Sequence, residues 1–195
     1  MKKCGLSHLQ PRMVIGNCQG RGNHALLHSI PELNRSQREQ FVRLIGPVFE
    51  HSPWISEQTW PKRPFADLDA LHESLCQTVR DAGDEKQLSL IRAHPDLVGK
   101  AALAGALTAA SNSEQASAGL DKLSSEEIAA FQKYNAAYRE KFGFPFVICA
   151  RLNKKEAILK AFPLRLEHSR PEEIKTALEE IGKIAYLRLR DIVQT

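Results

Sequence analysis

The sequence predicts an all-α fold: a single-domain helical bundle of about seven or eight helices. Apolar residues recur at intervals of three and four over most of the chain after position 34, and these stretches are bounded by residues that cap or stop helices. No pair of neighbouring segments alternates apolar and polar residues as paired strands do. The 195 residues are enough for one domain with a single core.

The first expected core helix starts at Asn34 or Ser36 and ends or kinks at Pro47, because proline interrupts the helical hydrogen-bond pattern. A shorter element is expected to start at Pro53 and to break at Pro61. The apolar positions of the first helix are Phe41, Leu44, Ile45 and Val48.

Two further helices are marked by their ends. Asp67 is expected to cap one helix, which Gly83 stops, and Asp84 is expected to cap the next, which runs to Arg92. The apolar stripe of the first of these two helices consists of Leu68, Leu71, Leu75 and Val79.

The stretch 93–115 gathers most of the candidate chemistry. Pro95 disfavours the α conformation at His94, so the chain should break between helices with His94 at the junction. The polar cluster 111–115 is interpreted as the cap and first turn of another helix, which brings side chains and free N–H groups together. These two features predict a small functional site.

In the second half, Ser124 and Glu127 form a capping box for a long helix that Gly143 ends. Residues 142–151 are apolar and β-branched enough to be extended rather than helical. Their backbone groups must be satisfied by something, and a core linker and a ligand-binding wall remain open alternatives. Pro171 opens the last helix.

Composition limits the classes of partner. Residues 1–29 show no sustained period and are expected to be a loosely ordered extension before a helical domain over 30–195. The formal net charge of +4 is spread among acidic residues, which does not indicate nucleic-acid binding, and no segment has the roughly 20 apolar residues needed to cross a membrane. Cysteines without C-x-x-C spacing favour reduced thiols in a cytoplasmic protein. They are Cys4, Cys18, Cys76 and Cys149.

Several kinds of chemistry compete for these residues. A nucleophilic triad from Ser111 or Ser113 with His94 and Asp96 lacks a G-x-S-x-G motif. A metal site lacks any H-E-x-x-H pair, and no glycine-rich phosphate loop is present, so neither a metal nor a nucleotide cofactor is expected. Acid–base work by His94, with Glu114 as a polar partner, remains.

Each of these residues also has a purely structural interpretation. From spacing alone, a histidine at a helix junction is more often a cap than a catalyst, and Glu114 alone is more often a first-turn carboxylate that complements the helix dipole. Glu50, His51, Trp54 and Trp60 raise the question of a functional role, but Trp residues flanked by prolines more often serve packing. Arg151 and Arg188 would usually be surface cations whose stems cover a core face.

Three motifs stand in order along the chain: A-H-P-D-L-V-G-K at 93–100, L-T-A-A-S-N-S-E-Q-A-S-A-G-L at 107–120, and N-A-A-Y-R-E-K-F-G-F-P-F-V-I-C-A-R at 135–151. Together with F-E-H-S-P-W at 49–54 and R-P-F at 63–65, they resemble the family of 2-oxo-4-hydroxy-4-carboxy-5-ureidoimidazoline (OHCU) decarboxylases. The resemblance covers about residues 30 to 192 and leaves the first 29 outside.

The resemblance implies decarboxylation of OHCU to (S)-allantoin in urate catabolism, inside an all-helical homodimer. No cofactor is implied, because the electrons left by departing CO₂ can flow into a ring C=N of the substrate itself. Motif matching assigns acid–base catalysis to His94, with Glu114 as its catalytic partner. The implied substrate-binding residues are Pro95, Ser111, Asn112, Ser113, Glu114, Gln115, Phe146, Val147, Ile148, Cys149, Ala150, Arg151 and Arg188.

Two questions stay open at the level of sequence. A helix N-terminus lowers the pKa of a nearby histidine whereas carboxylates raise it, so the resting charge of His94 is undetermined. A helical module that holds a purine-derived ligand without turning it over is the alternative to an enzyme.

Overall fold

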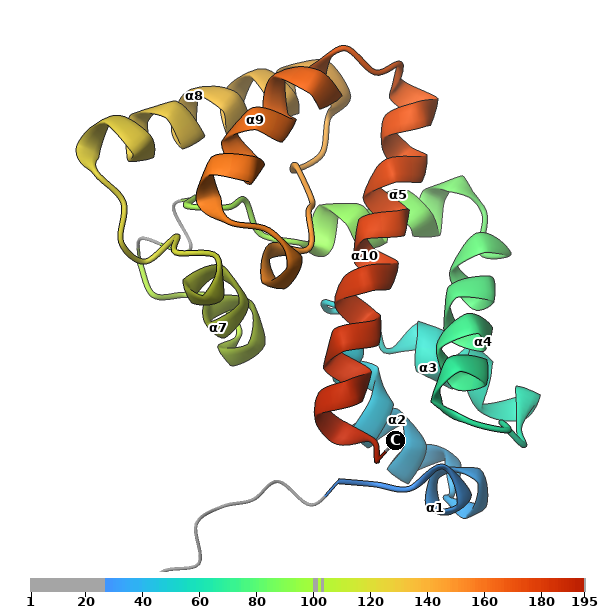
Figure 1. Cartoon of the computed structure of the whole chain (residues 1–195). Coiled ribbons are helices and arrows are strands. Elements are labelled where there is room, and N and C mark those ends of the chain that lie inside the picture. The colour runs from blue at the N-terminus through green and yellow to red at the C-terminus, as the bar shows by residue number, and fades with distance from the viewer. Residues whose placement is uncertain (1–26, 100–101, 103, 195) are drawn as a thin grey trace, which may run out of the picture.

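The computed structural model describes residues 27–99, 102 and 104–194. Figure 1 shows helices joined by loops, and the described residues contain nine α-helices, three short 3₁₀ helices and no strand. The predicted all-α, single-domain class is confirmed. The α-helices are α1 (Ile30–Arg35), α2 (Arg38–Ile45), α3 (Trp54–Thr59), α4 (Leu68–Arg80), α5 (Asp84–Ala93), α7 (Ala109–Ser117), α8 (Ser125–Phe142), α9 (Lys155–Leu166) and α10 (Arg170–Ile192). The 3₁₀ helices are η1 (Gly46–Val48), η2 (Trp60–Lys62) and η3 (Ala150–Leu152).

Helix α10 is the central element. It stands between the α8–α9 pair on one side and α3 and α4 on the other, with α5 crossing behind it (Figure 1), and it contacts α4, α5 and η1. Its buried apolar stripe recurs at helical spacing, so one long helix serves the core of both halves. That stripe consists of Ala177, Ile181, Ile184, Ala185 and Leu189.

An aromatic cluster fills the space between α8, α9 and the segment that follows α8. The Phe146 and Phe162 rings stack with centroids 3.9 Å apart, and Tyr138 meets Phe146 edge-on with centroids 5.2 Å apart. All three rings are almost completely buried. Aromatic pairs in these geometries stabilise beyond the area they bury, which fixes the segment against the helices.

Most predicted helix ends are confirmed. The Asp67 side chain accepts a hydrogen bond from the Ala70 N–H at 2.8 Å, and Ser124 forms the expected capping box with Glu127. Gly143 ends α8 with φ 78°, a left-handed conformation that glycine adopts without steric cost.

Three predicted boundaries are wrong by a few residues. The core helix expected from Asn34 or Ser36 is α2, which starts at Arg38, and a separate helix α1 precedes it: the Ser29 capping box starts α1 and the extended Ser36 ends it. Gly83, not Asp84, is the N-cap of α5, so Asp84 is its first helical residue. The Thr108 hydroxyl caps α7 by accepting from the Ser111 N–H, so residues 111–115 lie within that helix.

The segment between α8 and η3 is not helical, in line with the sequence prediction, and Cys149 at its end has the extended angles φ −70° and ψ 94°. Residues 145–149 have no regular secondary structure, and η3 begins at Ala150. The segment is mostly buried, so its backbone polar groups need partners other than bulk water.

The N-terminal extension is described only at its end. His28 forms a parallel bridge with Val193: its N–H donates to Ile192 O at 2.8 Å and its carbonyl accepts from Gln194 N at 2.9 Å. The preceding residues of the expected extension lie outside the described part of the chain. None of the described helices combines the length and apolar composition that crossing a bilayer requires.

Candidate active site

His94 occupies the predicted break. It is the C-cap of α5 in an extended conformation, with φ −77° and ψ 138°, directly before Pro95. Its Nδ1 lies 2.9 Å from the Leu90 carbonyl oxygen, and since a carbonyl can only accept, Nδ1 carries the hydrogen. Nε2 then bears the lone pair in the neutral ring, and it has no hydrogen-bond partner among the described residues.

Burial determines the charge of this imidazole. His94 is only 6 % exposed, and desolvation lowers its pKa to about 4, although the Leu90 carbonyl and the Glu50 carboxylate favour the charged form. The ring is therefore neutral near pH 7, and its free nitrogen can accept a proton. Burial, rather than a helix terminus, is the largest influence on the pKa of this imidazole.

A buried ionic cluster lies next to the imidazole. Arg188 on α10 holds Glu114 in a bidentate pair, with Nε–Oε1 and Nη2–Oε2 distances of 2.8 Å each. Its Nη1 donates to Glu50 Oε2 at 3.1 Å, and the Ser111 hydroxyl donates to that same oxygen at 3.2 Å. The cluster thus joins α7, α10 and the turn after η1, regions far apart in sequence.

The cluster carries two carboxylates against one guanidinium. Burial alone would raise the pKa of Glu50, but Arg188 outweighs it and holds that pKa below the usual value. Burial opposes the charge on Arg188 as well, yet its pairing with Glu114 and Glu50 raises its pKa. The cluster is therefore rich in hydrogen-bond acceptors, which suits a ligand with many N–H groups.

Helix α7 contributes a third polar side chain to the site, after Ser111 and Glu114. Gln115 is buried, and its Oε1 accepts from the Val98 N–H at 3.2 Å. Val98 has φ 53°, a left-handed conformation that is costly for a β-branched residue. Such strain persists only where the surroundings enforce it, so Gln115 helps to shape the turn after Pro95.

These side chains enclose a cavity of about 40 Å³. The polar cluster, the imidazole, the segment 146–150 and the turn after Pro95 all contribute to its lining. Its lining residues are His94, Pro95, Leu97, Ser111, Glu114, Gln115, Phe146, Val147, Ile148, Ala150, Ile184 and Arg188.

The alternatives weighed from sequence do not fit this geometry. Asp96 forms an ion pair with Arg139, with an Nε–Oδ2 distance of 2.9 Å, and a backbone carbonyl rather than Asp96 orients His94. A Ser–His–Asp triad is therefore not assembled. Over residues 27–99, 102 and 104–194, no group of three or more His, Cys, Asp or Glu side chains could hold a metal ion.

Comparison with known proteins places this geometry in a family. The model of the OHCU decarboxylase family matches residues 34–190, most of the chain. The 2-oxo-4-hydroxy-4-carboxy-5-ureidoimidazoline decarboxylase of Halalkalicoccus jeotgali is 42% identical over 164 residues, which cover 84% of this chain and 91% of that protein. The chain belongs to the OHCU decarboxylase family.

Two further similarities agree with this family of carboxy-lyases. The uric acid degradation bifunctional protein of Bacillus sp. is 37% identical over 163 residues, 84% of this chain but 32% of that protein. A crystal structure of (S)-allantoin synthase superimposes with a TM-score of 0.69 at 25% identity, covering 86% of this chain and 54% of that one. This chain thus corresponds to one part of those longer proteins.

Most residues that the family resemblance assigned to substrate binding meet at the cavity, but four do not line it. Asn112 and Ser113 are exposed on the outer face of α7. Cys149 turns its N–H to Glu180 Oε2 at 2.8 Å. Arg151 is exposed and forms an ion pair with Asp191, with an Nη1–Oδ2 distance of 2.5 Å.

Glu50 is the residue of the cluster that sequence reasoning underestimated. It is 4 % exposed and contacts both Ser111 and Arg188. The sequence favours packing for the Trp residues of the 49–60 stretch and gives Glu50 no defined role, because nothing local distinguishes it from a solvated glutamate. Its partners are 61 and 138 residues away in sequence, so only the tertiary structure reveals its role.

Proposed function

We propose that this protein decarboxylates OHCU to (S)-allantoin in urate degradation, with His94 as the general acid–base and Glu114 as its catalytic partner. Family membership over most of the chain supports the substrate. The role of His94 is supported by three features of its side chain. The imidazole is buried and neutral, its Nε2 has no hydrogen-bond partner among the described residues, and His94 lines the cavity.

The substrate supplies the electron sink. When the bond between the ring carbon and the carboxylate breaks, CO₂ leaves, the electron pair moves into the adjacent C=N, and the nitrogen of that group takes up a proton from water. The carbon that lost CO₂ still carries a hydroxyl group, whose proton must leave to form the product carbonyl, while the neighbouring ring carbon gains a proton on one face. A neutral imidazole can accept the first proton at Nε2 and deliver one to that carbon.

The ionic cluster suits the rest of the substrate. Glu114 and Gln115 can accept hydrogen bonds from the ureido and ring N–H groups, and the guanidinium of Arg188 can stabilise negative charge on the ring. In the free protein Arg188 is engaged with Glu114 on both sides of its fork. A substrate that pairs with Arg188 must therefore replace part of the ion pair between Arg188 and Glu114, because the guanidinium is already engaged.

The test is turnover of freshly generated OHCU, followed by circular dichroism and product analysis. The wild-type protein should accelerate formation of (S)-allantoin, and His94→Asn should lose about 10²–10⁴-fold in kcat, the usual contribution of a general acid–base. A wild-type rate equal to buffer alone would refute the decarboxylase. Full activity in His94→Asn would refute only the role of His94.

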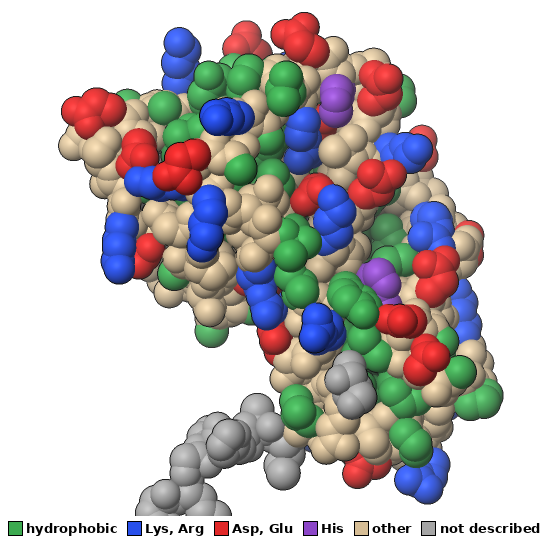
Figure 2. Space-filling view, viewed as in Figure 1, with side chains coloured by type: hydrophobic (Ala, Val, Ile, Leu, Met, Phe, Trp, Pro, Cys, Tyr) green, Lys and Arg blue, Asp and Glu red, His purple; other side chains and the backbone are tan. Residues whose placement is uncertain are grey.

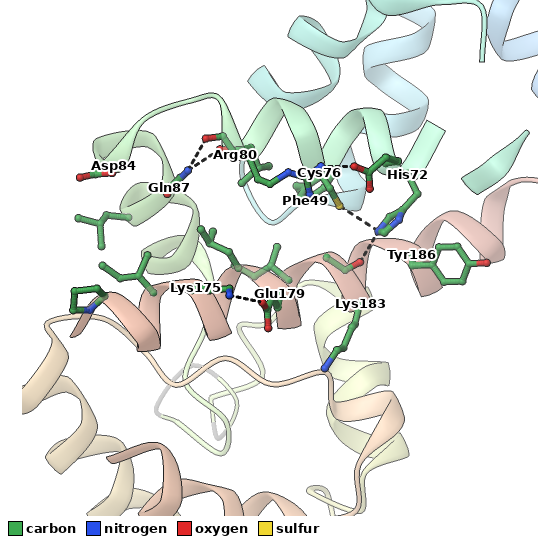
Figure 3. A pocket seen from close by; sticks show the side chains of 18 of the residues that line it. Phe49, His72, Cys76, Arg80, Asp84, Gln87, Lys175, Glu179, Lys183 and Tyr186 are labelled. Carbon is green, nitrogen blue, oxygen red and sulfur yellow. Dashed lines mark hydrogen bonds and ion pairs between the residues drawn. The ribbon is translucent and has the colours of Figure 1, made fainter. Parts of the chain in front are cut away.

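We also propose that the protein forms a homodimer through the groove between α4, α5 and α10. This hollow has a volume of about 1000 Å³ and a mostly apolar lining that includes Leu88, Ile174 and Leu178. Figure 2 shows apolar side chains gathered over α10 between charged side chains of both signs. In Figure 3, charged residues of α4 and α10 stand around the groove: Arg80, Lys175, Glu179 and Lys183.

A two-fold dimer brings the same patch of both subunits together, so the patch must complement itself. An apolar groove bordered by both signs of charge meets this requirement. Light scattering after size exclusion should give twice the mass of one chain, and Ile174→Asp should shift the mass to that of a monomer. Leu164→Asp, at a residue that is 68 % exposed outside the groove, is the matched control. A monomeric wild type would contradict the proposal.

We infer, finally, that the protein works in the cytoplasm. The two cysteines within the described residues, Cys76 and Cys149, are free, and free thiols suit a reducing compartment. Fractionation of the source cells tests this, and recovery outside the cytoplasmic fraction would contradict it.

A further inference from the structure

The extended segment that lines one side of the cavity is held by side chains instead of a neighbouring strand. The carbonyl of Val147 accepts from Arg165 Nη1 at 2.6 Å, and the N–H of Cys149 donates to Glu180 Oε2 at 2.8 Å. The Cys149 carbonyl accepts from Asn153 Nδ2 at 2.9 Å. We call residues 145–149 the wall. Charged side chains of α9 and α10 thus satisfy backbone groups of the wall, as a neighbouring strand would in a sheet.

The two charged anchors are paired with other groups as well: Glu180 Oε1 accepts a hydrogen bond from Lys183 Nζ at 2.5 Å. Arg165 and Glu180 are 7 % and 9 % exposed. Arg165 Nε donates to Oε1 of the fully buried Glu173 at 2.8 Å, and its guanidinium carbon lies 4.4 Å from the centroid of the Phe146 ring. A buried charge with several partners has few alternative positions, so Arg165 and Glu180 hold the wall in a defined position.

The geometry of an extended chain gives these contacts a consequence for the cavity. The N–H and C=O groups of alternate residues point to the same edge, so Val147 and Cys149 share the anchored edge and Ile148 presents its groups to the opposite one. Ile148 lines the cavity. Neither its N–H nor its C=O has a partner within the described part of the chain.

We propose that Arg165 and Glu180 are positioning residues for the reaction: they hold the wall so that the Ile148 peptide groups face the cavity and pair with the ring amide of the substrate. This proposal rests on the decarboxylase function proposed above. The anchors lie behind the wall, and neither lines the cavity, so they act through the wall rather than on the substrate.

Glu180 offers the sharper test, because removing Arg165 would leave Glu173 buried without its guanidinium. Glu180→Gln keeps an oxygen that accepts from the Cys149 N–H, whereas Glu180→Leu removes it. We expect Glu180→Leu to lose about 10–100-fold in kcat/KM, since small misplacements of binding groups have effects of this size. Glu180→Gln should stay within about 3-fold of wild type, which is rescue by the conservative variant.

A second readout does not depend on turnover. Hydrogen exchange of the Cys149 amide, followed by NMR, should be faster in Glu180→Leu and unchanged in Glu180→Gln. Lys155→Met is the matched control, because it breaks the pair with Glu127 between α9 and α8, whose Nζ–Oε1 distance is 2.7 Å, away from the cavity. If Glu180→Leu fails to fold, Glu180→Asp takes its place, since its carboxylate is one methylene shorter.

The outcomes separate the two proposals. A wild type that exchanges as expected but does not turn OHCU over would refute the function and retain the positioning of the wall. A wild type that turns over normally, with kcat/KM and Cys149 exchange unchanged in the leucine and aspartate variants, would overturn the positioning role. An equal loss in the glutamine variant would overturn it too, because the acceptor oxygen would then not be what matters.

Discussion

Replacing His94 with asparagine should remove a specific acid sensitivity of the fold. The asparagine amide can still donate to the Leu90 carbonyl, as the Nδ1–H of His94 does over 2.9 Å, but it does not titrate. In the wild type, burial lowers the pKa of His94 from 6.5 to about 4. The unfolded chain therefore binds a proton over a pH range in which the folded chain does not.

The sign and size of the effect follow from linkage. The free energy of unfolding contributed by this histidine is fully present above pH 6.5 and is lost as pH falls toward 4, because protons then favour the unfolded state. For a shift from 6.5 to about 4, the loss between pH 7 and pH 4.5 is about 2.5 kcal/mol. The side chain is 6 % exposed, so solvent screening does not reduce this figure much.

Urea unfolding at pH 7 and pH 4.5 measures the difference directly. Both proteins will lose stability to other groups, and the wild type should lose about 2.5 kcal/mol more than His94→Asn over this interval. Equal losses in wild type and His94→Asn would show that His94 titrates normally, and the argument for a neutral base would fail.

Three further outcomes are expected. Glu50→Gln removes a carboxylate that favours the imidazolium, so the pKa of His94 should fall further in an NMR titration, and a rise would contradict the cluster geometry. Arg188→Lys cannot hold Glu50 and Glu114 at once, so kcat/KM for OHCU should fall at least about 10-fold, and full activity would contradict a role for the fork. Gly143→Ala should lower the free energy of unfolding by about 1–2 kcal/mol because φ is 78°. Gly182→Ala in α10 should instead raise the free energy of unfolding by up to about 1 kcal/mol, because alanine favours a helix interior over glycine. The added Cβ would lie 3.6 Å from Cys76 Sγ, an ordinary contact distance.

Local sequence signals predicted the elements of this protein. Asp67, Ser124 and Gly143 mark helix ends through hydrogen bonds or backbone angles within a few residues, so their effect is independent of the rest of the fold. The break at His94 and Pro95 and the extended segment after α8 are local in the same sense. At Asp84 the prediction was wrong by one residue: Gly83 is the N-cap of α5, and no side chain caps this helix.

The composition of the site was decided by the tertiary structure. Spacing alone favoured a capping role for His94 and a surface position for Arg188 and gave Glu50 no defined role, and each interpretation is sound for an isolated segment. Burial changes these assignments. Desolvation keeps the His94 imidazole neutral, and the buried guanidinium of Arg188 stays charged because it pairs with Glu114 and Glu50. The sequence by itself determined the helices, the break and, through its motifs, the family. Which charges are buried together depends on contacts between residues more than 60 positions apart, and only the folded chain makes them.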